Sequence, residues 1–301
     1  MSVLSRPAVA DVLARLFAAT VNPAPKPAVR FTEIPGRTST VSIPTRYGAV
    51  DATIYHPPND DERPPVYLNL HGGGFVVGHP EQDDPWCRYL AARAGVTVVN
   101  PDYVLAPRHR FPAAPQQIYD IAWWVADGDR TWDGTRLCVG GQSAGGNLAA
   151  ATARQALENG GPDIALQVLF YAPLDLVTAT RDKPSTIGAR AVMKPWMGEV
   201  FDTAYIPDPA SRRDRLASPA NDDAHLAGIA PALVITAEHD RLRDEARRYA
   251  EKLDAAGALA EYYEAPGVDH GYNIMSSATD ITRATYDRIC GHVLRVTTNG
   301  E

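Results

Sequence analysis

Residues 137–145 of this 301-residue chain read Leu-Cys-Val-Gly-Gly-Gln-Ser-Ala-Gly, and this stretch decides the fold. The apolar residues 137–139 predict a short buried strand, and the alanine-rich pattern from Ser143 to the glycines at 160 and 161 predicts a helix. The G-x-S-x-G pattern at 141–145 joins the two. A reversal this sharp between strand and helix strains the serine backbone and needs neighbours without Cβ atoms. Ser143 is therefore predicted to be a nucleophile at a helix N-terminus, where the helix dipole favours negative charge.

Further short apolar runs lie on both sides of this stretch, with longer helical patterns between them. These runs cover residues 66–70, 96–99, 164–171 and 232–237. Strands that alternate with helices are joined by right-handed crossovers and form a mostly parallel sheet with helices on both faces. Before them, residues 41–43 and 50–54 alternate apolar with polar side chains and predict two antiparallel strands with one wet face. The sequence therefore predicts an α/β fold.

Two helical patterns stand outside this alternation, in residues 7–19 and in an insertion at 178–219. Their apolar residues at helical spacing are Val9, Val12, Leu13, Leu16 and Phe17 in the first, and Met193, Trp196, Met197, Val200, Phe201 and Ala204 in the second. The second is either an ordinary core helix or part of a lid over a pocket at the carboxyl edge of the sheet. We expect the lid, and hence a single domain over residues 1–301 with a helical cap made from about 1–27 and 178–219. Trp196, Met197 and Phe201 are expected to face the substrate pocket.

The composition excludes several classes of partner. A formal net charge of -7 and a pI near 5.6 disfavour nucleic acid and anionic membrane surfaces, which attract basic patches. No run approaches the roughly 18 apolar residues of a membrane span, and the N-terminus has no secretory pattern. The three cysteines, Cys87, Cys138 and Cys290, lack metal-type spacing and are expected to be buried or idle thiols. We predict a cytoplasmic protein that needs no metal.

A glycine-rich loop follows the predicted strand at 66–70, with the sequence His-Gly-Gly-Gly-Phe at 71–75. Three consecutive glycines cost backbone entropy, so a loop keeps them where the main chain must approach something closely. A merely flexible turn is the alternative, but the apolar residues 75–77 indicate a packed loop. We expect amides of this loop and of Ala144 to donate hydrogen bonds to a tetrahedral oxyanion.

A serine nucleophile needs a general base, and the chain has eight histidines. His71 belongs to the glycine-rich loop. His239 is the sequence neighbour of a candidate acid, Asp240, and neighbouring side chains point in different directions. His270 lies in a loop after the last predicted strand and before the last helix, and it is the predicted base.

The acid that orients this histidine is predicted to be Asp240, which follows the strand at 232–237 at its carboxyl end. Asp244 and Glu245 fall inside the next helix and are expected to be solvated or capping. Asp269 is too close to His270 in sequence to orient it readily. The chain order is then serine, acid, histidine, as in hydrolases with this serine turn.

Several separated motifs, from about residue 65 onward, resemble those of the hormone-sensitive-lipase-like carboxylesterases of the α/β-hydrolase superfamily. They are the glycine loop 71–74, the serine motif 141–146, Asp240 with residues 242–245, His270-Gly271, and the segments 102–107 and 111–114. The resemblance implies the α/β-hydrolase fold, the triad Ser143, Asp240 and His270, and oxyanion donors at Gly73, Gly74 and Ala144. It also implies a cap built from the N-terminal segment and the insertion.

The chain departs from the family pattern at four positions. Gln142 stands where aspartate or threonine is usual, Val104 and Arg108 replace an arginine and a glutamate, and Arg241 replaces a proline. None of these residues belongs to the predicted triad. The departures concern the support of the site and its substrate preference.

The expected activity is hydrolysis of small-molecule carboxylic esters with short- to medium-chain acyl groups, through an acyl-enzyme and without a cofactor. One alternative is an amidase, such as an arylformamidase, or a natural-product deacetylase with the same site. Another is a non-catalytic binder of small molecules. The resemblance also implies a possible homodimer through an exposed sheet edge.

Overall fold

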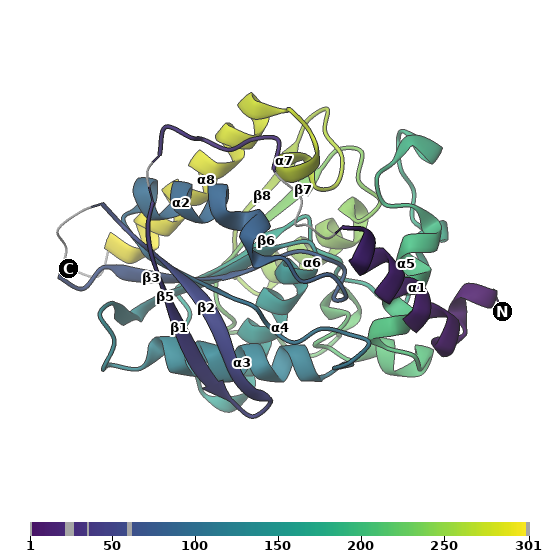
Figure 1. Ribbon diagram of the computed structural model, residues 1–301, viewed down its shortest axis with the longest axis horizontal. Helices are drawn as coiled ribbons and strands as arrows, with labels where there is room; N and C mark the ends of the chain where they lie inside the picture. Colours follow the sequence, from purple (N-terminus) through teal and green to yellow (C-terminus); the bar gives the residue numbers. More distant parts are fainter. Residues whose placement is uncertain (1, 22–26, 35, 59–61, 299–301) are drawn as a thin grey trace.

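The computed structural model describes residues 2–21, 27–34, 36–58 and 62–298, and it contains an eight-stranded sheet between two layers of helices (Figure 1). The strand order is β1-β2-β4-β3-β5-β6-β7-β8. The strands are β1 (Arg37–Thr45), β2 (Gly48–His56), β3 (Pro65–Leu70), β4 (Thr97–Pro101), β5 (Asp133–Gln142), β6 (Leu166–Phe170), β7 (Ala232–Ala237) and β8 (Leu259–Ala265). β1, β2 and β4 pair antiparallel, and every later pair is parallel. The predicted α/β class and α/β-hydrolase fold are confirmed.

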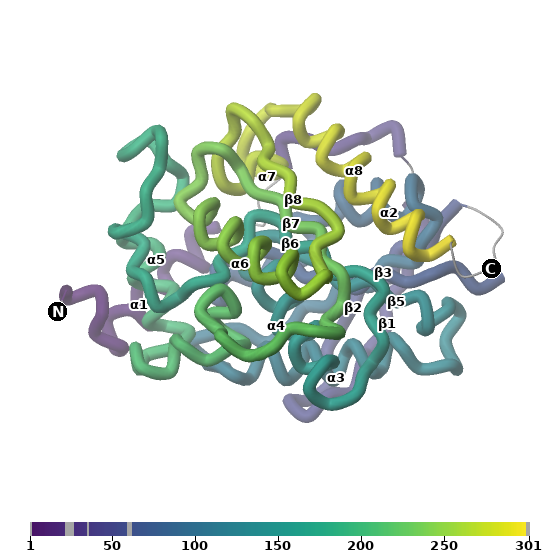
Figure 2. The backbone as a smooth tube through the Cα atoms, turned by 180° about the vertical axis from the view of Figure 1, so that it is seen from behind, coloured from purple at the N-terminus to yellow at the C-terminus, as the bar shows by residue number. Residues whose placement is uncertain are grey.

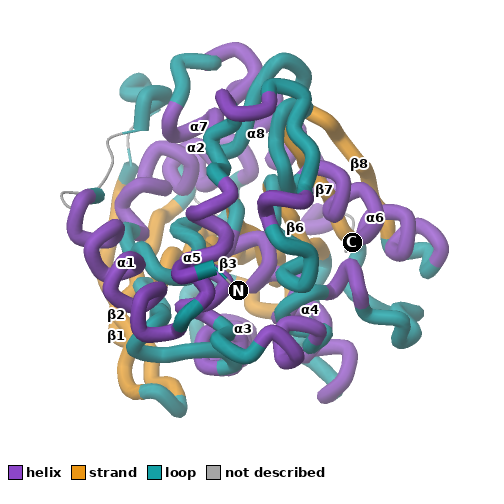
Figure 3. Tube along the Cα trace, turned by 90° about the vertical axis from the view of Figure 1, so that its right-hand side faces the viewer, coloured by secondary structure: helices purple, strands orange, loops and turns teal. Residues whose placement is uncertain are grey.

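Helices cover both faces of the sheet (Figures 2 and 3). One face carries α2 (Asp84–Ala94) and α8 (Thr279–Thr298), and the other carries α3 (Ala113–Ala126), α4 (Ala144–Asn159) and α6 (Arg243–Ala255). The strands supply both layers by alternation: in β7, Val234 belongs to the apolar cluster under α4 and α6, whereas Leu233 and Ile235 belong to the cluster under α8.

Short helices connect these elements. They are α7 (Tyr272–Met275), η1 (Val3–Ser5), η2 (Pro80–Asp83), η3 (Thr180–Asp182), η4 (Gly188–Arg190), η5 (Pro209–Arg213) and η6 (Pro219–Asn221).

In the part of the chain that the structure describes, no helix is both long and apolar enough to cross a membrane. Cys87, Cys138 and Cys290 are free and buried, as expected.

Helix α4 runs directly from the serine turn and is buried from Ala144 to Ala156. Alanine on every face lets this helix approach the sheet closely, because a methyl side chain adds little thickness to the layer. It ends at Gly160, whose φ of 75° gives the left-handed conformation that terminates helices. The helix predicted from the sequence is confirmed at both ends.

Two further helices, α1 (Pro7–Thr20) and α5 (Pro195–Tyr205), pack against each other beyond the carboxyl ends of the strands (Figures 1 and 3). Phe17 makes edge contacts with Trp196 and Phe201, with ring centroids 6.1 and 5.3 Å apart. Both helices were predicted, and Pro195 occupies the first turn of α5. Residues 1 and 22–26 of the predicted N-terminal cap segment lie outside the described residues.

The buried seam of α1 differs from the predicted one. Ala10 and Ala14 are fully buried, whereas Val12 and Leu16 are 53% and 58% exposed. The most buried positions of α1 therefore carry small residues, and two of its larger aliphatic side chains face solvent.

Candidate active site

The serine turn between β5 and α4 has the strained geometry that the sequence predicts. Ser143 has φ 53° and ψ -122°, a conformation that non-glycine residues rarely adopt. A Cβ atom at Gly141 or Gly145 would lie 2.2 or 1.8 Å from the carbonyl oxygen of Leu70, at the end of β3. Both glycines are required because the turn folds directly against the neighbouring strand.

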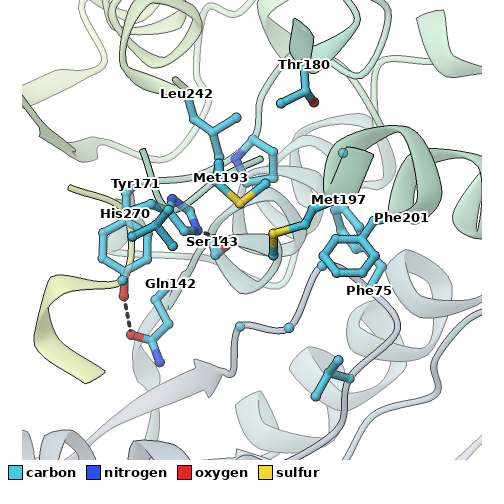
Figure 4. Close-up of a pocket in the computed structure, with 18 of the residues that line it drawn as sticks. Phe75, Gln142, Ser143, Tyr171, Thr180, Met193, Met197, Phe201, Leu242 and His270 are labelled. Atoms are coloured by element: carbon cyan, nitrogen blue, oxygen red, sulfur yellow. Dashed lines mark hydrogen bonds between the residues drawn. The ribbon is translucent and has the colours of Figure 1, made fainter. Parts of the chain in front are cut away.

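A chain of hydrogen bonds joins the three residues of the predicted triad. Ser143 Oγ lies 2.9 Å from His270 Nε2 (Figure 4), and His270 Nδ1 lies 2.7 Å from Asp240 Oδ2. The second carboxylate oxygen of Asp240 accepts from the amide of Leu242 at 3.0 Å. Ser143 begins α4, Asp240 follows β7 and His270 follows β8, so parallel strands bring the three side chains to one edge of the sheet.

The environment of His270 favours its protonated form. Burial lowers the pKa of this histidine, but the charge and hydrogen bond of the Asp240 carboxylate outweigh burial, and the pKa is raised above 6.5. Asp240 is 2% exposed and His270 6% exposed, so their hydrogen bond is shielded from water. A neutral His270 can take the serine proton, and the resulting imidazolium is stabilised by Asp240.

The alternative acid and base considered from the sequence have other partners. Asp269 Oδ2 accepts from the amide of Val192 at 2.6 Å, and Asp269 Oδ1 accepts from the amide of His270 at 2.7 Å. The imidazole of His239 is 2.7 Å from the hydroxyl of Thr186. Neither residue joins the hydrogen-bonded chain at Ser143.

The expectation for Glu245 is wrong. Its carboxylate is 2% exposed and lies 2.5 Å from the ammonium of Lys183, which the insertion carries against α6. Burial raises the pKa of Glu245 to about 7, with the Lys183 charge acting in the opposite direction. The sequence places Glu245 in an amphipathic helix but gives no sign of a cation from the insertion. Asp244 is partly exposed and paired with Arg243, as expected for a solvated residue.

The glycine-rich loop lies against the serine turn. A Cβ atom at Gly72 would be 3.5 Å from the Cβ of Ser143, which places the loop backbone beside the serine. Gly73 and Gly74 have φ angles of 138° and 59°, which favour glycine. Among the described residues, no group accepts a hydrogen bond from the amides of Gly73, Gly74 or Ala144. These amides are free to donate to a substrate.

This loop is held in place, as its apolar flank suggested. The hydroxyl of Tyr103 donates to the carbonyl of His71 at 2.7 Å, and the two rings stack with centroids 4.2 Å apart. The amide of Gln82 donates to the carbonyl of Gly72 at 3.0 Å. Buried donors on both sides fix the peptide planes of the loop, so the free amides are preorganised.

A cavity of about 200 Å³ opens beside Ser143, and residues of α1 and α5 form part of its wall (Figure 4). Its walls are mainly apolar: Phe17, Val21, Phe75, Leu176, Val192, Met193, Met197, Phe201, Leu242, Ile274 and Met275. Met197 and Phe201 are among the residues that line it.

Trp196 does not line this cavity, and the expectation for it is wrong. Its side chain is 43% exposed and packs on the outer side of Phe17. Successive helix residues are turned by about 100°, so the position before Met197 points away from the cavity that Met197 and Phe201 face. Apolar spacing identified the helix but not the direction of each side chain.

A buried polar network beneath Ser143 was not found from the sequence. The amide nitrogen of Gln142 donates to Asp83, and the amide oxygen accepts from the hydroxyl of Tyr171 and from Asn273, each at 2.7 Å. Asn69 donates to the other oxygen of Asp83 at 2.9 Å. Burial raises the pKa of Asp83 to about 7, although both hydrogen bonds favour its ionised form. Gln142 was singled out only as a departure from the family pattern.

Comparisons with known proteins identify the family to which the chain belongs. A model of the α/β-hydrolase fold family matches residues 67–274. The esterase LipI of Mycobacterium tuberculosis is 36% identical over 250 residues, which are 78% of this chain and 76% of that protein. An ethyl acetate hydrolase of Pseudomonas putida is 35% identical over 245 residues, 79% of this chain and 76% of that protein.

Among solved structures, a hyperthermophilic esterase from the archaeon Pyrobaculum calidifontis superimposes with a TM-score of 0.80 at 34% identity, over 98% of this chain and 91% of that one. The chain belongs to the hormone-sensitive-lipase-like esterase family of the α/β-hydrolase superfamily and is an enzyme of the carboxylesterase class. The predicted family and enzyme class are confirmed.

Proposed function

We propose that the enzyme hydrolyses carboxylic esters through a catalytic triad of Ser143, His270 and Asp240. The observation that carries the proposal is the buried hydrogen-bonded chain from Ser143 Oγ through the imidazole to the Asp240 carboxylate. The same hydrogen-bonded chain argues against a non-catalytic binder. Binding alone does not require a serine in a strained turn next to a general base.

In the first half of the reaction, Ser143 Oγ attacks the ester carbonyl carbon while His270 Nε2 takes the hydroxyl proton. The carbonyl electrons move to oxygen, and the negative charge that develops there is stabilised by the amides of Gly73, Gly74 and Ala144. Each donor of this kind lowers the barrier by about 3 kcal/mol. The tetrahedral adduct then collapses, and the imidazolium gives its proton to the departing alcohol.

In the second half, water attacks the acyl-enzyme. His270 takes a proton from the water, and the same amides stabilise the second oxyanion. Collapse returns the proton to Ser143 Oγ and releases the carboxylic acid. Asp240 keeps the imidazole in the tautomer whose Nε2 accepts and stabilises the imidazolium that forms.

The substrates that fit best are esters with short- to medium-chain acyl groups. The cavity of about 200 Å³ is smaller than the roughly 300–1,000 Å³ of drug-sized ligand sites, and its walls are mainly apolar. The similarity to an ethyl acetate hydrolase supports a small substrate. An amidase or arylformamidase, or a deacetylase of a natural product, would use the same residues, so substrate comparison must separate these activities.

The test combines a substrate series with one variant. Wild-type protein should hydrolyse p-nitrophenyl acetate, butyrate and octanoate, with the highest kcat/KM at the short to medium lengths, and should be slower on N-formyl and N-acetyl aryl amides. Ser143→Ala should lower turnover by about 10⁴-fold or more and abolish labelling by an organophosphate while retaining the fold. Labelling at another serine would overturn the triad, and faster turnover of the amides would assign the alternative activity.

We also propose that α1 and α5 form a cap over this site and that the domain spans the chain. Phe17 of α1 and Met197 and Phe201 of α5 supply cavity wall, which supports a role in substrate selection. Removing the first 20 residues should then lower kcat/KM for small esters without unfolding the core.

A homodimer through a sheet edge remains a proposal. In the sheet that the described residues form, β8 is an edge strand, and a second copy could pair with its outer side. Sedimentation velocity of the wild type and of a proline variant in β8 would test this assembly.

A further inference from the structure

One part of the otherwise apolar cavity is polar, because Thr180, Lys183 and Asp202 also line it. Figure 4 shows Thr180 away from Ser143, at the opposite end of the labelled residues from Gln142. Asp202 is 8% exposed, and among the described residues its carboxylate has charged neighbours at a distance but no hydrogen-bond partner. An unpaired carboxylate that is more than nine-tenths buried therefore borders the space where substrate binds.

This buried carboxylate lowers the stability of the folded protein when it is ionised. Burying an ionised group without a partner costs several kcal/mol, and a helix position in an apolar wall would ordinarily carry an apolar side chain. Burial accordingly raises the pKa of Asp202 to about 6. Buried, perturbed groups that border a cavity are commonly functional.

The nearby Lys183 is already committed to other partners. Its ammonium lies 2.5 Å from Glu245 Oε2 and donates to the carbonyl of Asp175 at 2.6 Å. Within the described ranges it forms no ion pair with Asp202. The charges of Lys183 and Arg212 lower the pKa of Asp202 from a distance, against the larger effect of burial, but among the described residues neither cation pairs with its carboxylate.

The hydroxyl of Thr180 lies on the same side of α5 as Asp202. A Cβ atom at Gly198 would be 1.8 Å from Thr180 Oγ1, so the threonine is packed against the helix backbone at that position. Gly198 and Asp202 are four residues apart and share one helix face. Among the described residues, Thr180 Oγ1 contacts the helix at Gly198 and has no hydrogen-bond partner. A hydroxyl and a carboxylate, both unpaired, thus lie about one helical turn apart at the cavity wall.

We propose that Asp202 and Thr180 form a polar subsite for a hydrogen-bond donor, a hydroxyl or ammonium group, carried by the substrate at a distance from the reacting ester. An ionised carboxylate only accepts hydrogen bonds, whereas the threonine hydroxyl can donate or accept, so the complementary group must be a donor. The apolar walls between this subsite and Ser143 accommodate the hydrocarbon that links the donor to the ester. The inference deepens the proposed function and rests on it, and it names hydroxy- or amino-substituted esters as the preferred class.

The experiment compares esters that differ only in one terminal group. p-Nitrophenyl esters of unbranched acids with four to ten carbons are paired with their ω-hydroxy counterparts, and alkyl acetates are paired with ω-hydroxyalkyl acetates. At one chain length in one of the two series, the hydroxy ester should have a kcat/KM about 10- to 100-fold higher than its alkyl partner, as expected for a hydrogen bond to a charged group. Esters that end in a carboxylate should be poorer than both.

Two variants of Asp202 and a matched control assign the effect. Asp202→Asn and Asp202→Leu should remove the preference for the hydroxy ester, and the leucine variant should invert it in favour of the alkyl ester. Glu199→Gln removes a carboxylate from the same helix at a position that does not line the cavity, and it should leave the ratio unchanged. If Asp202 is merely structural, its variants will lower both members of each pair equally, together with the melting temperature, and the subsite is overturned.

The outcomes separate this inference from the proposed function. If Ser143→Ala still hydrolyses p-nitrophenyl acetate, the triad is refuted. The ratios of kcat/KM between hydroxy and alkyl esters would then say nothing about this site. Hydrolysis that depends on Ser143, with equal rates for hydroxy and alkyl esters at every length in both series, refutes the subsite alone. A preference for terminal carboxylates would also refute it, because Lys183 would then be the recognising group.

Discussion

The ring of Phe201 on α5 occupies the space into which a side chain at Gly74 would project, since a Cβ atom there would lie 2.4 Å from the ring. The cap helix therefore packs directly on the loop whose amides are proposed to bind the oxyanion. We expect the position of α5 and the geometry of this loop to be coupled through this contact.

Gly74→Ala should lower kcat for p-nitrophenyl acetate by about 10²-fold, because a misplaced donor loses its stabilisation of the transition state. The methyl group must displace Phe201 and also strains a backbone with φ 59°. Steady-state kinetics of Gly74→Ala, Phe201→Ala and the double variant form a double-mutant cycle. The double variant should recover part of the loss. Strict additivity of the two effects would show that the contact does not couple the cap to the loop.

The rate of ester hydrolysis should rise with pH through an apparent pKa above 6.5, because His270 must be neutral to take the proton and its pKa is raised. In Asp240→Asn the carboxylate charge is lost, so burial dominates and the pKa of His270 falls. The rate should drop by about 10⁴-fold and its acidic limb should move to lower pH. Asp244→Asn, at a partly exposed neighbour, is the control and should leave the profile unchanged. A flat profile from pH 5 to 9, with chemistry rate-limiting, would argue against His270 as the base.

Asp83 should make the folded protein less stable at alkaline pH. Its folded-state pKa of about 7 lies above the ordinary value of 3.8, so the folded state holds this proton more tightly than the unfolded state does. The stabilisation is complete below about pH 4 and is lost as pH rises through 7. Between pH 5 and 8, the free energy of unfolding should fall by on the order of 2 kcal/mol more in wild type than in Asp83→Asn. Urea titrations at both pH values measure this difference.

The control for that experiment is Asp84→Asn, which changes an adjacent, half-exposed aspartate paired with Arg88. It should follow the wild-type pH dependence. An Asp83→Asn protein with the wild-type slope would mean that Asp83 is ionised in the folded state at pH 5.

Trp196 and Phe201 should respond differently to alanine substitution. Phe201 lines the cavity, so Phe201→Ala enlarges it and should move the optimum of a p-nitrophenyl ester series toward longer acyl chains. Trp196 is 43% exposed outside the cavity, so Trp196→Ala should leave the chain-length profile unchanged and destabilise the protein by about 1 kcal/mol. Equal shifts of the profile in both variants would mean that Trp196 reaches substrate after all.

The parts of the site that follow from local chemistry were predictable. Ser143 is marked by a strand, a glycine-flanked turn and a helix within one short segment, and Asp240 and His270 each follow a strand at the edge where parallel strands end. The fold follows from the same alternation of apolar runs. These features depend on neighbours in sequence, which periodicity and turn chemistry describe well.

The parts that depend on distant partners were not predictable from one sequence. Glu245 was expected to be solvated or capping because no residue near it in the sequence indicates its partner Lys183. Gln142 and Asp83 are hydrogen-bonded, but they lie in two segments whose sequence patterns do not indicate the contact. Trp196 was misplaced because apolar spacing defines a stripe that is wider than the cavity it covers. Asp202 lies beside that stripe on α5, and its spacing gave no sign that it borders the cavity.

The contact between Phe17 and Phe201 also has a consequence for how the protein forms during translation. Helix α1 leaves the ribosome well before α5, and an isolated helix of 14 residues is only marginally stable in water. Until α5 has been synthesised, Phe17 has no ring to pack against, and the nascent chain carries an exposed apolar segment. We therefore expect the cavity beside Ser143 to close late in biogenesis, after the sheet that supports it has begun to assemble. Nascent chains halted before α5 should then remain dependent on holdase chaperones.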